Sequence, residues 1–243
     1  MPGDADIASV AALMGEPARA AVLMALADGR ALAATTLAAE AKVAPSTASG
    51  HLGRLVEGGL VTVESSGRHR YFRLAAPEVA AALEALARLA PHQHVRSLSQ
   101  GTHAEAIRRA RTCYDHLAGR LGVALLDGLV ATGCLHAQEV VEESDPVLGA
   151  GRARTYLLTD DGRSRLGALG VALDPPTRRP LTRYCIDWSE QRPHLAGWLG
   201  AALLTRLVEL GWVLRAPKRV VKVTEAGWAR LAERLGVDLD ACR

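Results

Sequence analysis

The C-terminal two thirds of the chain contain an internal repeat, and this repeat constrains the fold more than any other feature. Residues 111–135, RTCYDHLAGRLGVALLDGLVATGCL, align with residues 183–213, RYCIDWSEQRPHLAGWLGAALLTRLVELGWV. Each copy then ends with a short strand and a helix that starts at a threonine or at the acid after it. Repeated sequence predicts repeated structure. We therefore expect two similar α+β units, each a helix, a strand or hairpin and a second helix, over residues 112–172 and 183–238.

The two copies share residues that can bind metals or react. Cys113, Asp115 and His116 in the first copy correspond to Cys185, Asp187 and His194 in the second. The histidine precedes a shared glycine by 17 residues in both copies, and six extra residues, WSEQRP, separate aspartate from histidine in the second copy. So many matches are not expected by chance, which makes these residues candidates for a site.

Several interpretations of these residues stay open. The aspartates could simply cap the long helices, and the histidines could be buried structural donors. If pseudo-two-fold symmetry brings the copies together, two sulfurs and two nitrogens could hold zinc or another thiophilic metal ion. The ligands in that case would be Cys113, His116, Cys185 and His194.

A small organic effector is a further interpretation. Trp188 lies in the six extra residues and could line a pocket between the repeats, next to the cysteines and histidines. Thiols beside histidines could also sense oxidation, or Cys113 and His116 could act as a nucleophile and its base. The sequence contains no Gly-rich phosphate loop and no GxSxG motif, so we expect no enzyme.

The N-terminal third predicts short helices followed by a β-hairpin. Apolar residues recur at helical spacing over residues 7–14 and 22–27, and a third helix is expected over residues 33–41. Pro45 then starts another helix after a very short connection, since proline is favoured in a first helical turn. Two helices joined so closely form a helix-turn-helix.

The second helix of this pair, PSTASGHLGRL, has an unusual surface. Its apolar side chains share one face, whereas the other face carries hydroxyls, glycine, histidine and arginine in place of the glutamate and lysine usual on solvated helices. Small hydroxyls can approach phosphates and base edges in a major groove, and Arg or His can donate to guanine. The predicted DNA contacts of this helix are Ser46, Thr47, Ser49, Gly50, His51 and Arg54.

A basic hairpin follows directly. Val61 and Val63 alternate as in a strand, SSGRHR forms a turn, and YFRL returns as a second strand. A basic tip next to a helix-turn-helix is typical of a wing that contacts phosphates. We therefore add Arg68, His69 and Arg70 to the predicted DNA contacts.

Three segments carry a family resemblance. GEPARAAVLMALADGR, STASGHLGRLVEGGLVTVESSGRHRYFRL and PEVAAALEALARLA together resemble the winged-helix repressors of the ArsR/SmtB family, over residues 5 to about 96. The resemblance implies a homodimer, closed by the first helix and the helix over 77–90, that reads a two-fold operator. The family's metal motifs are absent, because residues 37–43 contain no cysteine and the pair His92 and His94 has no matching carboxylates.

These features predict a mainly α protein with small β-hairpins, an α+β fold in two domains. Residues 1–96 form a winged helix-turn-helix domain for DNA binding and dimerisation, residues 97–111 a linker that enters a helix, and residues 112–243 an effector domain built of the two repeats. The expected function is transcriptional regulation by a dimeric repressor that binds double-stranded operator DNA and responds to an effector. The alternative is an enzyme or thiol-redox domain fused to a DNA-binding module.

Composition limits where such a protein works. No window of 18 consecutive apolar residues occurs, and the sequence MPGDADIASV lacks the features of a signal peptide. The four cysteines are far apart and form no CxxC pair, so we expect reduced thiols in the cytoplasm and no membrane partner. The net charge of +3 decides nothing about nucleic-acid binding, which must depend on local placement.

Overall fold

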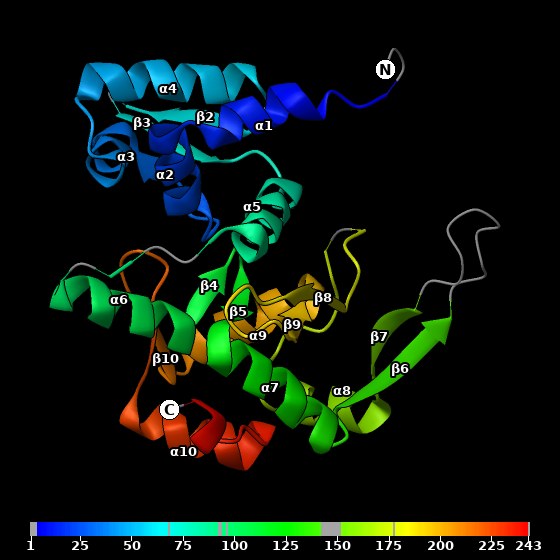
Figure 1. Ribbon diagram of the computed structural model, residues 1–243. Helices are drawn as coiled ribbons and strands as arrows, with labels where there is room; N and C mark the ends of the chain where they lie inside the picture. Colours follow the sequence, from blue (N-terminus) through cyan, green and yellow to red (C-terminus); the bar gives the residue numbers. More distant parts are fainter. Residues whose placement is uncertain are drawn as a thin grey trace. The chain divides into compact units, whose positions relative to one another are not determined.

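The computed structural model describes residues 4–67, 69–91, 94–95, 97–141, 152–176 and 178–242 (Figure 1). Arg68, one of the predicted wing contacts, and His92 lie outside the described residues. The chain divides into two compact units, Met1–Ala87 and Arg88–Arg243. The predicted fold class, mainly α with small antiparallel hairpins, is confirmed.

The first unit consists of helices around a small sheet. The helices are α1 (Ile7–Gly15), α2 (Pro17–Leu26), α3 (Ala34–Ala41), α4 (Pro45–Glu57) and α5 (Pro77–Leu89). The strands β1 (Leu32–Ala33), β2 (Val61–Ser66) and β3 (His69–Leu74) form an antiparallel sheet of order β1-β3-β2. Strand β1 has only two residues and was not predicted from the sequence. It pairs with β3, where Leu32 lies opposite Phe72.

Local sequence explains where these helices begin and end. Pro17 and Pro45 occupy the first turns of α2 and α4, where a missing N–H costs nothing. Lys42 ends α3 in the left-handed conformation, which turns the chain sharply into α4. Helix α3 packs against α2 and α4, and this arrangement is the helix-turn-helix.

No single helix in the described part of the chain is long and apolar enough to span a membrane. Helices α1 and α2 reach that threshold only as a pair, and they are bent by 89° relative to each other.

The second unit contains a helix that begins earlier than the sequence predicts. Residues 97–111 were expected to be a linker, but α6 (Leu98–Arg109) fills most of that span, with the Ser97 side chain accepting from Gln100 N. Arg111 starts the first strand of the unit and is completely buried. The expected linker is therefore wrong as a description of these residues, because α6 packs on the core of the second unit.

The two repeats have the same order of elements. The first contains β4 (Arg111–Cys113), β5 (His116–Ala118), α7 (Gly119–Ala131), β6 (Leu135–Val141), β7 (Arg152–Leu158) and α8 (Asp160–Ala168). The second contains β8 (Arg183–Ile186), β9 (Pro193–Ala196), α9 (Gly197–Glu209), β10 (Val213–Arg215), β11 (Val221–Val223) and α10 (Glu225–Leu235), and a short 3-10 turn, Asp240–Cys242, follows. Each copy thus opens with a hairpin, which the expected order of helix, strand and helix lacked.

Matching contacts hold the second half of each repeat. Thr159 caps α8 and Thr224 caps α10, and their Oγ1 atoms accept from the third helical N–H at 2.9 and 3.0 Å. The same hydroxyls donate to the carbonyls of Gly133 and Gly211 at 2.7 and 2.9 Å. These contacts tie each last helix to the turn after the long helix of its own repeat.

The two repeats bury one shared core. Leucines of α7 and α9 alternate with those of the surrounding helices and strands, and the side chains of Leu121, Leu129, Leu199 and Leu203 are completely buried. In addition, α7 packs on β9 and α9 packs on β5, so each long helix covers the hairpin of the other repeat. Neither repeat can bury its apolar surface without its partner.

Candidate functional site

Helix α4 has a buried face and an exposed face, as its sequence predicts. Ala48, Leu52 and Leu55 are at most 2% exposed in the core of the first unit. The predicted contacts Ser46, Thr47, Ser49, Gly50 and Arg54 are exposed. Ala44, the residue before Pro45, caps the helix without a side-chain hydrogen bond. The exposed face therefore consists of small polar groups and one guanidinium.

His51 differs from the expectation. Its side chain is 15% exposed, and its Nδ1 lies 3.4 Å from Oε2 of Glu16, the residue that caps α2. The predicted outward position of His51 is therefore wrong, because the ring is held between α4 and the start of α2. The helix periodicity alone did not reveal the carboxylate that attracts it.

The wing hairpin presents exposed cations. Strands β2 and β3 pair from Val61 opposite Leu74 to Ser66 opposite His69. His69 and Arg70 are exposed, and the Arg70 guanidinium lies 5.2 Å from the centre of the Phe72 ring. Arg73 is paired with Glu64 at 3.0 Å, so its charge is balanced within the hairpin. Among the described wing residues, His69 and Arg70 are thus the predicted contacts that are exposed.

The opening hairpins of the two repeats bring the four predicted metal ligands together. Cys113 lies directly opposite His116 in the first hairpin, and Cys185 lies directly opposite His194 in the second. Directly opposite residues project from the same face of a hairpin. One ligand atom from each of the four side chains lies within 4.8 Å of all the others. We call Cys113, His116, Cys185 and His194 the Cys/His cluster.

The Cys/His cluster is closely enclosed. Cys113 and His116 are 2% and 4% exposed, His194 is completely buried, and Cys185 is half-buried. The two imidazole rings stack with centres 5.2 Å apart and planes inclined by 28°. All four cysteines of the chain, including Cys134 and Cys242 outside the cluster, are thiols and not disulfides.

A carboxylate accompanies each histidine. Oδ1 of Asp115 lies 3.2 Å from Nδ1 of His116, and Arg179 makes a two-pronged contact with the same carboxylate, with one Nη donating to Oδ1 at 3.1 Å. Burial raises the pKa of Asp115, but the contacts with His116 and Arg179 outweigh it and lower the pKa to about 2. Burial lowers the pKa of His116, whereas the neighbouring Cys113 and Asp115 raise it to about 9. Asp115 is therefore ionised and fixed beside the imidazole.

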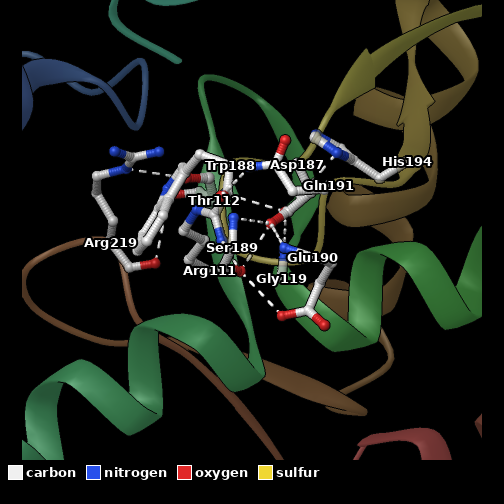
Figure 2. Close-up of polar contacts among 10 residues, drawn as sticks. All are labelled: Arg111, Thr112, Gly119, Asp187, Trp188, Ser189, Glu190, Gln191, His194 and Arg219. Atoms are coloured by element: carbon white, nitrogen blue, oxygen red, sulfur yellow. Dashed lines mark hydrogen bonds and ion pairs between the residues drawn. The ribbon is translucent and has the colours of Figure 1, made fainter. Parts of the chain in front are cut away.

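Asp187 has a denser set of partners (Figure 2). Its Oδ2 lies 2.9 Å from the Arg111 guanidinium, and both residues are completely buried. Its Oδ1 accepts from the N–H and hydroxyl of Ser189 and from the N–H of Glu190, all within the six extra residues. Burial raises the pKa of Asp187, but the Arg111 charge and these hydrogen bonds lower it to about 2. The extra residues of the second repeat thus wrap around this carboxylate.

The expected capping role of the aspartates is only partly right. The structure places Asp115 and Asp187 in hairpins and not in the first turns of α7 and α9. Asp187 does satisfy a helix start, since its Oδ2 accepts from Gly119 N at 2.6 Å, but that helix is α7 of the other repeat. The carboxylate therefore links the two repeats.

Trp188 does not lie at the centre of the Cys/His cluster. Its ring covers the Arg111 side chain, with the guanidinium carbon 4.7 Å from the ring centre (Figure 2). This placement favours a cation–π contact that shields the buried ion pair. The remaining tryptophans, Trp198, Trp212 and Trp228, pack against the core.

Comparison with known proteins identifies the family. A sequence profile described as a helix-turn-helix domain matches residues 14–64. The HTH-type transcriptional regulator YdfF of Bacillus subtilis is 37% identical over 237 residues, which cover 96% of this chain and 99% of YdfF. The chain belongs to this family of HTH-type transcriptional regulators. The helix-turn-helix transcriptional regulator predicted from the sequence is thereby confirmed.

Solved structures similar to the regulator each cover less than two fifths of it. The cadmium metal-sensor CMTR of Mycobacterium tuberculosis is 29% identical, covers 38% of this chain and 99% of its own, and has a TM-score of 0.31. The homodimeric winged helix-turn-helix domain Mb0332 of Mycobacterium bovis, a possible ArsR-family regulator, is 28% identical, covers 39% of this chain and 100% of its own, and also has a TM-score of 0.31. The relationship with YdfF, in contrast, extends through both repeats.

Sequence interpretation missed two residues that support the Cys/His cluster of the regulator. Arg179 lies between the repeats and Arg111 was assigned to the linker, yet each holds one of the two aspartates. The signal in the sequence was the repeated pair Asp115 and Asp187. A buried carboxylate stays ionised only beside a cation or hydrogen-bond donors, so this pair predicts such partners elsewhere in the chain.

Proposed function

We propose that the regulator is a dimeric repressor whose α4 helices read the major groove of a two-fold operator, and whose second unit binds the effector that controls DNA affinity. The observation that carries the proposal is the exposed face of α4, where small hydroxyls and Arg54 stand opposite a fully buried apolar face. Small side chains allow close approach to base edges, and an arginine can donate twice to guanine. In this proposal Ser46, Thr47, Ser49, Gly50 and Arg54 face the groove, and His69 and Arg70 approach the backbone.

Exposed apolar side chains support dimerisation. Ile7 on α1 is 73% exposed and Leu86 on α5 is 49% exposed, and Val10 and Leu89 on the same helices are exposed too. Large apolar side chains gathered on two helices favour an interface with a second copy. We propose that α1 and α5 form this interface, so that two α4 helices meet one duplex.

Family membership favours regulation over the alternative of an enzyme or thiol-redox domain fused to a DNA-binding module. We further propose that the regulator works in the cytoplasm, where operator DNA is available to it.

The DNA-reading role of α4 predicts a loss of specificity in Arg54→Ala. We expect operator affinity to fall by about 1–3 kcal/mol, roughly 5-fold to 150-fold, while affinity for unrelated DNA changes little, because the lost contact is to a base. The operator is first selected from random duplexes with the wild-type protein, and affinities are then measured by fluorescence anisotropy. A reporter promoter carrying that operator should be repressed by the wild type and less by the variant.

Two further substitutions sharpen this experiment. Arg70→Ala should weaken binding to all duplexes alike. It should also lower the steepness of the plot of log affinity against log salt concentration by about one. Arg230→Ala, on the exposed face of α10 in the second unit, is the matched control and should leave both properties unchanged. Wild-type operator affinity and selectivity in Arg54→Ala would contradict the proposed groove contact.

The proposed interface predicts that Leu86→Glu gives a monomer. A carboxylate placed in an apolar interface has to be desolvated without a partner, which opposes association. We expect sedimentation velocity to give a dimer for the wild type and a monomer for the variant, with weaker operator binding. Leu214→Glu, at a 51% exposed leucine of β10, should remain dimeric. A dimeric Leu86→Glu variant would rule out this helix as the interface.

A further inference from the structure

The Cys/His cluster has the composition of a soft metal site. Two sulfurs and two imidazole nitrogens form the donor set that Zn²⁺ and related thiophilic ions take in tetrahedral sites. The four ligand atoms already lie within 4.8 Å of one another, a spacing that small side-chain rotations would close around an ion. The donors come from paired positions on two hairpins, so the backbone presets their grouping.

His194 supplies a second and independent observation. Its ring is completely buried, and neither nitrogen has a hydrogen-bond partner among the described residues. Nδ1 lies 3.8 Å from Oδ2 of Asp187, which is too long for a hydrogen bond. A buried imidazole without partners costs free energy that a bound ligand would recover. The His194 imidazole is therefore in place for a partner that the described residues do not provide.

Each histidine also has a carboxylate near its Nδ1, as metal-binding histidines usually do. In zinc sites, the imidazole nitrogen that does not bind the metal usually meets a carboxylate, which orients the ring. Asp115 stands beside Nδ1 of His116 and Asp187 beside Nδ1 of His194, at 3.2 and 3.8 Å. This leaves Nε2 of each ring for the ion. Arg179 and Arg111 hold the two carboxylates in place.

Charge also balances at this position. Two thiolates neutralise one divalent ion, and the two carboxylates next to the histidines are already neutralised by arginines. The loaded site, with two thiolates, two neutral imidazoles and one divalent ion, therefore carries no net charge of its own. Cys185, the half-buried member, gives the ion a path from solvent, while the enclosed remainder excludes water.

We propose that Cys113, His116, Cys185 and His194 bind one thiophilic divalent ion of the Zn²⁺ type, which clamps the opening hairpins of the two repeats together. The ion would add a direct link between the two hairpins to the Asp187 contacts that already join the repeats, so occupancy would couple the two repeats. The statement that this ion is the effector rests on the effector control proposed above. Metal binding itself is tested without DNA.

The test is a titration of the full-length, fully reduced protein with Co²⁺ and then Zn²⁺. We expect one Co²⁺ per chain, with the intense visible bands of tetrahedral cobalt and a thiolate-to-cobalt charge-transfer band, both removed by one equivalent of Zn²⁺. Zn²⁺ should also raise the unfolding temperature of the second unit, since it binds the folded state. Elemental analysis of the purified protein gives the stoichiometry independently.

Variants assign the binding to the cluster. Cys113→Ser, Cys185→Ser and His194→Gln should each lower affinity at least about 100-fold, and Asp115→Asn about 10-fold to 100-fold through the misplaced imidazole. Cys134→Ser makes the same substitution at a buried thiol outside the cluster and should bind as the wild type does. Circular dichroism checks folding, and Cys185→Ser at the half-buried position is the variant to read if Cys113→Ser does not fold.

Three results would overturn the inference. They are the absence of stoichiometric Co²⁺ or Zn²⁺ binding by the reduced wild type, wild-type affinity in Cys185→Ser, and a Cys113–Cys185 disulfide that forms in air in a protein that binds no ion. Operator affinity with and without Zn²⁺ is measured separately. An ion that binds without changing operator affinity leaves the metal site standing and contradicts effector control, whereas operator binding by a protein that takes no ion contradicts the metal site alone.

Discussion

Asp187→Asn should destabilise the second unit by about 3–5 kcal/mol, the cost of breaking a buried ion pair from one side. Arg111 and Asp187 are both completely buried, so the substitution leaves a guanidinium charge without its counter-charge in the core. The asparagine side chain keeps the shape of the aspartate but weakens the acceptor for the Gly119 N–H at the start of α7. Both repeats should therefore loosen at their junction.

Tryptophan fluorescence can measure this effect in the intact chain. All four tryptophans lie between positions 188 and 228, within the second unit, so urea unfolding followed by their emission reports that unit separately. Asp127→Asn breaks a comparable pair with Arg192, but those side chains are 51% and 57% exposed. The control should therefore lose about 1 kcal/mol or less. Equal losses in the two variants would contradict the structural importance of the buried pair.

Gly227→Ala should destabilise the same unit by about 2–3 kcal/mol. A Cβ at this position would lie 2.0 Å from the Trp212 carbonyl oxygen and 3.0 Å from Oγ1 of Thr224, the cap of α10. The backbone of α10 has to move to relieve the clash, and this strains the cap and the packing behind it. The corresponding Gly162 of the first repeat meets the Cys134 carbonyl oxygen at 2.1 Å, so Gly162→Ala should have a similar effect.

Gly167→Ala is the matched control for this prediction. Gly167 lies within α8, and the nearest atom to its added Cβ is Cδ1 of Leu173 at 3.9 Å, an ordinary contact. Alanine should raise the stability of the second unit by up to about 1 kcal/mol, because glycine is a poor helix former. The changes in stability of both variants are measured as shifts of the urea unfolding midpoint, with an unchanged dependence of the unfolding free energy on urea concentration. A Gly227→Ala protein as stable as Gly167→Ala would contradict the close approach between α10 and the preceding turn.

The extra residues of the second repeat explain why the two halves of the site differ. Ser189 and Glu190 fold back onto Asp187 and bury it, whereas Asp115 is 26% exposed and depends on Arg179. The repeat therefore keeps equivalent ligands but supports them differently. The Asp187 carboxylate is completely buried, and the Asp115 carboxylate is partly exposed.

Short-range patterns were sufficient for much of this regulator. The helices of the first unit and the wing hairpin could be predicted because apolar periodicity, proline and glycine act over a few residues, and the two repeats because the copies are directly visible in the sequence. The choice of exposed residues on α4 followed from the same periodicity and is right for Ser46, Thr47, Ser49, Gly50 and Arg54. It failed for His51, whose position depends on Glu16, a residue 35 positions away in the chain.

Contacts between distant segments decided the rest. The sequence by itself determined which residues are repeated, and so named Cys113, His116, Cys185 and His194 as a set. Only the tertiary structure decided that a hairpin opens each repeat, that cysteine faces histidine across each hairpin, and that Arg111 and Arg179 hold the aspartates. The physical reason is that each hairpin is covered by the long helix of the other repeat, so the packing that positions these side chains arises when the two copies fold together.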